Sequence, residues 1–182
     1  MQLLRLFIFC CCLVSAALGS AAPSYPLFLN GDRNYILVDA HQGTAWYLDR
    51  DSVYAELYQP PEYIMQLYVV KVDEMDKGNT APNRMIHLRL RYNLAQRAMY
   101  YDRTDKGTWQ QLPPHGTWAQ TGVMMPAGEA AFYLFFGEKF YGRWSFPQER
   151  DGKIVGHASP FASAFYDRLK DDIIIPVMQN NR

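Results

Sequence analysis

Short runs of apolar, β-branched and aromatic residues occupy most of the chain before residue 113, and turn residues separate them. Such runs, bounded by Gly, Pro, Asn or Asp, are typical of β-strands. The predicted strands are Tyr35–Asp39, Thr44–Asp49, Val53–Tyr58, Tyr63–Val72, Met85–Tyr92, Ala98–Asp102 and Thr108–Leu112. Because turns connect consecutive runs, their order predicts an antiparallel meander.

Two of these strands differ in the number of faces that are apolar. In Met85–Tyr92 apolar and polar residues alternate, so this strand should have one wet face. The two sets are Ile86, Leu88, Leu90 and Tyr92 on one face and Met85, His87, Arg89 and Arg91 on the other. Both faces of Tyr63–Val72 are largely apolar, which predicts a central strand that is covered on both sides.

The pattern changes to a helical one after Pro126. The segment Ala127–Tyr141 is apolar nearly all round, which predicts a largely buried helix. Pro126 suits a first helical position, and Gly142 suits a stop. A second, amphipathic helix is predicted from Ser159–Pro160 to Leu169. Strands followed by helices predict an α+β domain: an antiparallel β-sheet meander with a C-terminal helix packed on one face, plus a second short amphipathic helix.

The N-terminal residues have the pattern of a secretory signal peptide. Arg5 precedes the apolar block Leu6–Leu18, and the small residues Gly19–Ala22 follow. The block is too short to span a bilayer comfortably. A lipoprotein signal is disfavoured because Phe9, and not a small residue, precedes the first cysteine. We therefore expect a signal peptide at 1–21, an extended leader at 22–33, a single α+β domain at 34–176 and a frayed tail at 177–182.

Compartment, cysteine content and charge narrow the range of functions. The mature protein is expected outside the cytoplasm, in the periplasm, at the cell surface or secreted, with no integral membrane segment after signal removal. All three cysteines, Cys10–Cys12, lie in the expected signal, which excludes cysteine zinc sites and thiol nucleophiles from the mature chain. Of 18 basic and 18 acidic residues, removal of Arg5 leaves 17 against 18, which argues against nucleic-acid binding.

The candidate chemistry is that of a binding surface. His87, Arg89 and Arg91 form a basic stripe on the wet strand face, and arginine suits carboxylates, phosphates or sulfated sugars; an ordinary solvated face is the alternative. Trp109 and Trp118 flank Pro113–Pro114 and could form an exposed partner site.

No catalytic, metal or cofactor site is predicted elsewhere. The four histidines are scattered and lack zinc-site spacing. The aspartates near strand ends, Asp49, Asp51, Asp102 and Asp105, are expected to act as turn caps.

Three segments together resemble the surface-adhesin protein E-like family of small exported bacterial proteins. They are Ala45–Val53, the hairpin Arg89–Tyr92 with Met99–Asp102 and Gly107, and Glu129–Phe140. The resemblance covers roughly Asn34–Tyr141. It implies an antiparallel sheet packed on a helix, export, and attachment to host or matrix proteins, without catalysis. Family members often carry one cysteine in the hairpin and one in the helix; this chain has neither.

These observations favour an exported bacterial, non-enzymatic binding or accessory protein, adhesin-like, that binds a protein or a polyanionic glycan. The alternative is a periplasmic structural or assembly factor of the envelope, without a small ligand, that joins other envelope proteins. The two functions predict different exposure of the protein to protease, because a surface adhesin is accessible on intact cells and a periplasmic factor is not.

Overall fold

The computed structural model describes residues 25–174. The expected signal peptide 1–21, the start of the expected leader and the expected tail 177–182 lie outside the described residues. Within residues 25–174, no helix has the length and apolar character needed to cross a membrane.

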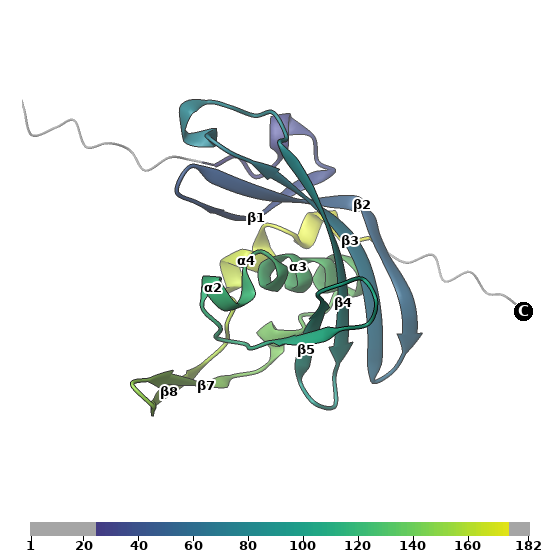
Figure 1. Ribbon diagram of the computed structural model, residues 1–182, viewed down its shortest axis with the longest axis vertical. Coiled ribbons are helices and arrows are strands. Elements are labelled where there is room, and N and C mark those ends of the chain that lie inside the picture. The colour runs from purple at the N-terminus through teal and green to yellow at the C-terminus, as the bar shows by residue number, and fades with distance from the viewer. Residues whose placement is uncertain (1–24, 175–182) are drawn as a thin grey trace, which may run out of the picture.

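The strands form two antiparallel sheets (Figure 1). The main sheet is a six-stranded meander in chain order: β1 (Tyr35–His41), β2 (Thr44–Gln59), β3 (Glu62–Val72), β4 (Arg84–Asn93), β5 (Ala98–Asp102) and β6 (Trp109–Leu112). A separate hairpin contains β7 (Phe146–Arg150) and β8 (Lys153–Ala158). The Asp151–Gly152 turn of this hairpin has two positive φ angles, 52° and 72°, as a tight hairpin turn requires.

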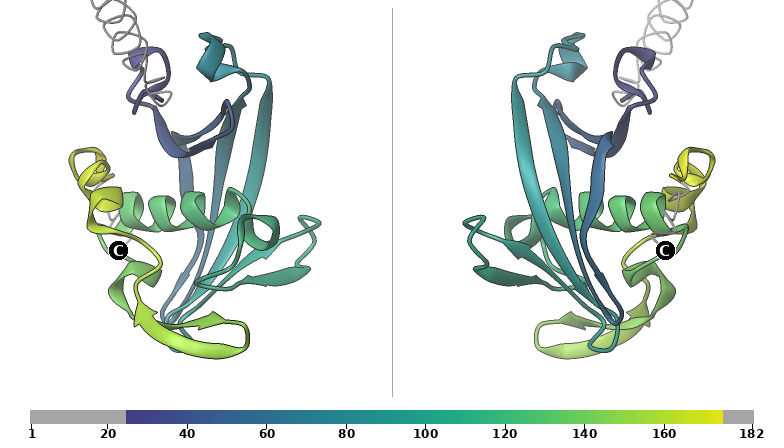
Figure 2. Two further views of the ribbon diagram at one scale, coloured as in Figure 1. Left: turned by 90° about the vertical axis from the view of Figure 1, so that its left-hand side faces the viewer. Right: turned by 90° about the vertical axis from the view of Figure 1, so that its right-hand side faces the viewer.

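The helices follow the main sheet in the chain. They are α2 (Trp118–Thr121), α3 (Met124–Phe136) and α4 (Ser163–Asp167), with 3-10 turns at Leu29–Gly31, Met75–Lys77, Tyr141–Arg143 and Lys170–Asp172. Figure 2 shows α3 with the C-terminal elements packed against one side of the long strands. The predicted class, an α+β meander with a C-terminal helix on one face and a second short helix, is therefore confirmed.

The predicted bounds of the main helix, Ala127–Tyr141, were wrong at both ends. The helix starts at Met124 and stops at Phe136, because Gly137 adopts φ 69° and its N–H bonds to the Tyr133 carbonyl at 2.8 Å. A left-handed residue of this kind ends a helix.

A buried carboxylate holds the chain after the helix. Glu129 is fully buried and accepts hydrogen bonds from the amides of Phe140 at 2.9 Å and Tyr141 at 2.8 Å. It also accepts one from the Tyr166 hydroxyl at 2.6 Å. Burial raises the pKa of Glu129 despite these donors. One side chain thus fastens two C-terminal segments to α3, which helical spacing in the sequence does not reveal.

Two other predicted elements have different bounds. The predicted runs Thr44–Asp49 and Val53–Tyr58 are one bent strand, β2, whose pairing with β3 is irregular between Asp49 and Tyr54. Ser52 bridges this irregularity, since its hydroxyl donates to the Asp49 carbonyl at 2.5 Å and accepts the Tyr68 amide at 2.8 Å.

The second helix starts at Ser163, four residues after Ser159. The Ser159 hydroxyl accepts the Phe161 amide at 3.4 Å and donates to its carbonyl at 3.1 Å. These contacts form a local turn where the sequence predicted the helix cap.

Apolar cores lie on both faces of the sheet, as predicted for the central strand β3. The larger core joins the inner face, defined here as the face toward α3, to the helix; its buried β3 members are Tyr63, Met65, Leu67 and Val69. The smaller core joins β1–β3 to the 3-10 turns at Leu29–Gly31 and Met75–Lys77; its buried members are Leu29, Leu37, Ala45, Tyr47, Val70, Val72 and Met75. It covers only the end of the sheet that carries those turns.

Candidate functional site

The rest of the face opposite α3, called the outer face here, carries exposed aromatic and apolar side chains. Tyr54 is 51% exposed, Tyr68 41% and Met85 58%. Exposed apolar and aromatic side chains that gather on one surface often mark an interaction site.

The strand register places most of the predicted site residues on this face. His87, Arg89 and Arg91 alternate with the buried residues of β4. Gln66 of β3 lies opposite Arg89, and Tyr100 of β5 lies opposite Arg91. Opposite residues in an antiparallel pair project from the same face. Asp102 of β5 and Trp109 of β6, which also pair, extend this row to the sheet edge.

Arg89 is held by two carboxylates. Its Nε and Nη2 donate to Glu56 at 2.7 and 2.6 Å, and its Nη1 donates to Asp102 at 2.9 Å. The hydrogen bond from Arg89 lowers the pKa of Glu56 to about 2. The charge of Arg89 is therefore already balanced within the protein, and its guanidinium fixes β2, β4 and β5 relative to one another.

Asp102 also shapes the β5–β6 turn, as predicted for a turn cap. Its side chain is fully buried and accepts the amides of Gly107 at 2.6 Å and Thr108 at 3.0 Å, in addition to the Arg89 guanidinium. Burial works to raise the pKa of Asp102, but these donors together hold it below its usual value. The turn and the Arg89 network therefore share one carboxylate.

Arg91 has a different environment. Its guanidinium carbon lies 4.6 Å from the ring centroid of Tyr100 and 5.2 Å from that of Trp109. No carboxylate within residues 25–174 forms an ion pair with it, and its Nε is buried without a hydrogen-bond partner. Aromatic rings attract a guanidinium and fix its position but do not satisfy its N–H donors. Arg91 is thus a positioned cation with no carboxylate partner among the described residues.

His87 completes the stripe. Its Nε2 lies 2.9 Å from the Gln66 amide oxygen, and its Nδ1 lies 3.4 Å from an oxygen of Asp105. Tyr68 packs beside its ring, with the centroids 5.1 Å apart. The histidine therefore extends the polar and aromatic network toward the exposed Tyr68.

Trp118 lies apart from the other four predicted residues. It begins α2, is 42% exposed, and packs against His41 at 4.4 Å and Trp46 at 5.0 Å between ring centroids. Trp46 belongs to the inner-face core. The two tryptophans that flank Pro113–Pro114 therefore do not share one surface, because Trp109 projects from the outer face.

The sequence missed two members of the network. Glu56 was missed because β2 contains irregularities, so simple alternation does not assign its face. Tyr100 follows regular alternation in β5 and pairs with Arg91; a search for aromatics opposite the basic stripe could have found it.

The part of the chain that the structure describes contains no group of three His, Cys, Asp or Glu side chains placed to hold a metal ion. Comparisons of the chain with protein-family models, with curated proteins and with solved structures gave no match.

Proposed function

We propose that this chain is an exported bacterial, non-enzymatic binding protein that holds a partner protein on the outer sheet face. Arg91, Tyr100 and Trp109 form the anchor of this surface. The observation that carries the proposal is a guanidinium fixed between two aromatic rings with no carboxylate partner among the described residues. Trp, Tyr and Arg are the residue types most enriched at the energetic centres of protein interfaces.

The charge balance of this face favours a protein over a polyanionic glycan. Binding of a polyanion calls for several uncompensated cations. Here Glu56 and Asp102 already compensate Arg89, and Asp105 lies beside His87. One free arginine among exposed tyrosines matches a protein surface that presents one carboxylate.

Three carboxylates are buried within residues 25–174, and they support a binding role over catalysis because each is engaged in holding the fold. Glu129 fastens the C-terminal segments to α3, and Asp102 fastens the β5–β6 turn. Asp172 accepts two hydrogen bonds from Arg33, at 2.7 and 3.1 Å. The proposed export rests on the sequence of residues 1–21, and the adhesin-like role rests on the resemblance of the sequence segments described above.

Site-specific photo-crosslinking in the producing cells tests the proposal. A photo-reactive benzoylphenylalanine replaces Tyr68 on the outer face. In a second strain it replaces the exposed Lys77, which ends the 3-10 turn Met75–Lys77. We expect Tyr68 to give an adduct of one discrete mass and Lys77 to give none. Mass spectrometry of the adduct then identifies the partner.

Two arginine variants provide the matched comparison. Arg91→Ala removes the fixed cation, and Arg84→Ala removes an equal charge from the exposed start of the same strand. Loss of a charged interface anchor costs about 2 kcal/mol or more, which is at least about 30-fold in affinity. The adduct should therefore disappear in Arg91→Ala and persist in Arg84→Ala. Equal adduct in both variants would contradict the proposed anchor.

A heparin column separates the protein partner from the polyanionic glycan. We expect the purified mature chain to elute at low salt, and Arg91→Ala to elute with it. Strong retention that the Arg91→Ala substitution abolishes would favour the glycan instead.

A further inference from the structure

The last strand of the main sheet has one unpaired edge. Among the strands of residues 25–174, β6 is the terminal one and pairs with β5 alone. The Arg103 amide donates to the Thr108 carbonyl at 3.0 Å, so this pair is a hydrogen-bonded one. Backbone groups of an antiparallel strand alternate between the partner and the opposite side. The N–H and C=O groups of Trp109 and Gln111 therefore point to the open edge.

The other end of β6 shows the same alternation. The Tyr141 hydroxyl accepts the Met99 amide at 2.9 Å and donates to the Leu112 carbonyl at 2.6 Å. It thus bridges β5 and β6 at a position where the two strands face each other. Leu112, like Thr108, directs its carbonyl toward β5, which leaves Trp109 and Gln111 to face outward.

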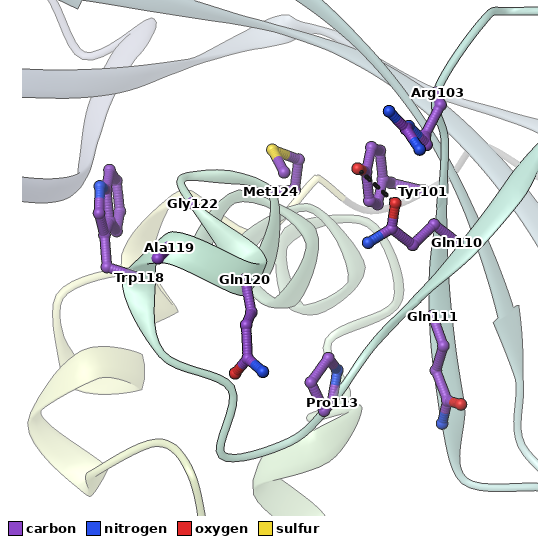
Figure 3. A pocket seen from close by; sticks show the side chains of 10 residues that line it. All are labelled: Tyr101, Arg103, Gln110, Gln111, Pro113, Trp118, Ala119, Gln120, Gly122 and Met124. Carbon is purple, nitrogen blue, oxygen red and sulfur yellow. Dashed lines mark hydrogen bonds between the residues drawn. The ribbon is translucent and has the colours of Figure 1, made fainter.

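A groove lies between this region and α2. Its larger part, about 620 Å³, has Tyr101, Arg103 and Gln110 on the strand side and Trp118 and Gln120 on the α2 side. Figure 3 shows the strand residues across from α2, with the side chain of Gln110 directed toward α2 and that of Gln111 directed away.

A smaller depression of about 410 Å³ continues the groove. It shares Pro113 and Gln120 with the larger part and reaches Phe146 and Glu149 of the β7–β8 hairpin. The two depressions therefore form one path past the open strand.

The two ends of this path have opposite charge. Arg103 lines the end near Trp109, and Glu149 lines the end beyond Leu112. Within residues 25–174 neither side chain forms an ion pair. The groove is therefore complementary to a chain that carries an acidic group at one end and a basic group at the other.

We infer that this groove binds an extended peptide segment of a partner protein, which adds to the open edge of β6 as a further antiparallel strand. Its basic N-terminal end lies at Glu149 and its acidic C-terminal end lies at Arg103. Strands in a sheet lie about 4.8 Å apart, so the added strand runs beside β6 with α2 as its other wall. Main-chain hydrogen bonds to Trp109 and Gln111 supply affinity, and the charged ends supply direction. This site uses the main chain of Trp109, whose side chain belongs to the outer face, and it does not depend on the function proposed for that face.

A second copy of the protein fits this groove less well than a single peptide. In each copy α2 lines the groove that runs along its own β6. Pairing two β6 edges brings both α2 helices into the space of one added strand. A lone extended segment carries no such helix.

A peptide titration followed by NMR tests the inference on the mature chain. The probe is acetyl-Lys-Thr-Val-Thr-Val-Thr-Glu-amide, and the control peptide exchanges the terminal Lys and Glu. We expect the probe to shift the amide resonances of Trp109 and Gln111, and the control to bind about fivefold more weakly because it opposes both charges. Exchange of the protein charges, Arg103→Glu with Glu149→Lys, should reverse this preference.

Two substitutions of one residue test the added strand itself. Gln111→Pro removes an N–H that the sheet does not use, whereas Gln111→Ala keeps it and removes only the side chain. Proline is accepted in edge strands where its missing N–H faces solvent. We expect Gln111→Pro to weaken binding about five- to tenfold and Gln111→Ala to bind as the unchanged chain does.

Several results would overturn the inference. They are no shift at β6 with millimolar peptide, equal binding by the Gln111→Pro and Gln111→Ala variants, or a preference that survives the charge exchange. A concentration-dependent dimer that Gln111→Pro abolishes would assign the edge to a second copy and would equally overturn it.

Discussion

The two faces of the main sheet use aromatic side chains in different ways. On the inner face the rings of Tyr63, Tyr92 and Phe140 pack around Phe132 of α3, with centroids 5.0–5.8 Å apart. On the outer face Tyr100 and Trp109 hold guanidinium groups at similar distances. A helix covers the first set, so its rings stabilise the fold. No helix within residues 25–174 covers the second set, and its rings hold the Arg91 guanidinium, which has no carboxylate partner among those residues.

The largest effect should come from removing a ring on the inner face. Phe132 is 2% exposed and contacts rings on β3, β4 and the segment after α3. Phe132→Ala should lower the free energy of unfolding by about 3–5 kcal/mol, because it leaves a cavity in the core. Urea denaturation measures this loss.

The matched variant on the outer face is Tyr54→Ala. Tyr54 is 51% exposed, so its loss should change the free energy of unfolding by about 0.5 kcal/mol or less. Equal losses in the two variants would remove the distinction between the faces.

A smaller difference in unfolding free energy is expected between substitutions of Arg89 and of Arg91. Arg89→Leu leaves the buried Asp102 without its cation and should cost about 1–3 kcal/mol of unfolding free energy, the range for an unsatisfied buried polar group. Arg91→Leu breaks no ion pair within residues 25–174 and should cost about 1 kcal/mol or less, the contribution of cation–π contacts at a partly exposed site. If Arg91→Leu were the more destabilising, Arg91 would be a structural residue and not a binding anchor.

The smallest effect concerns two carboxylates whose pKa values shift in opposite directions. On the outer face the pKa of Glu56 is lowered from 4.5 to about 2 by Arg89. Its contribution to stability is therefore complete above pH 4.5 and is lost as the pH falls through 2. Because Glu56 is about one third exposed, we expect this contribution to be about 1 kcal/mol.

Glu129 should have the opposite pH dependence. Burial raises its pKa above 4.5, so the native state binds its proton more tightly and stability falls as the pH rises through that raised pKa. Thermal unfolding across pH 2–8 measures both trends. Glu56→Gln should reduce only the loss of stability at acid pH, and Glu129→Gln should remove only the decrease in stability above pH 4.5. Any other assignment of the two trends would contradict the pKa directions.

The sequence predicted those features that depend on local pattern. Alternation in Met85–Tyr92 placed the basic stripe on one face, and the turn residues separated the strands of the meander. The end of α3 was missed because Gly137, and not Gly142, adopts the left-handed conformation that ends the helix. The hydrogen bonds from the amides of Phe140 and Tyr141 to Glu129, 11 and 12 residues earlier, leave no trace in helical spacing.

The arrangement of the proposed binding anchor could be predicted only in part. Alternation assigned Arg89 and Arg91 to the same face, but it could not show that one is compensated and the other is not. That difference depends on Glu56, which an irregular strand brings to the outer face. The separation of Trp118 from Trp109 likewise depends on the path of the chain through Pro113–Pro114, which composition does not specify.

Cysteine labelling in intact cells tests most directly whether a partner occupies the outer face. A chain that begins after residue 21 carries no cysteine, so the variants Tyr68→Cys and Lys77→Cys each contain one reactive thiol. The thiols are labelled with a membrane-impermeant maleimide in cells whose outer membrane has been permeabilised. We predict that both sites react in the purified protein and that only the Tyr68→Cys site is protected in cells. In the double variant Tyr68→Cys with Arg91→Ala, labelling of the Tyr68→Cys site in cells should return. Equal labelling of the two sites in cells would contradict the account.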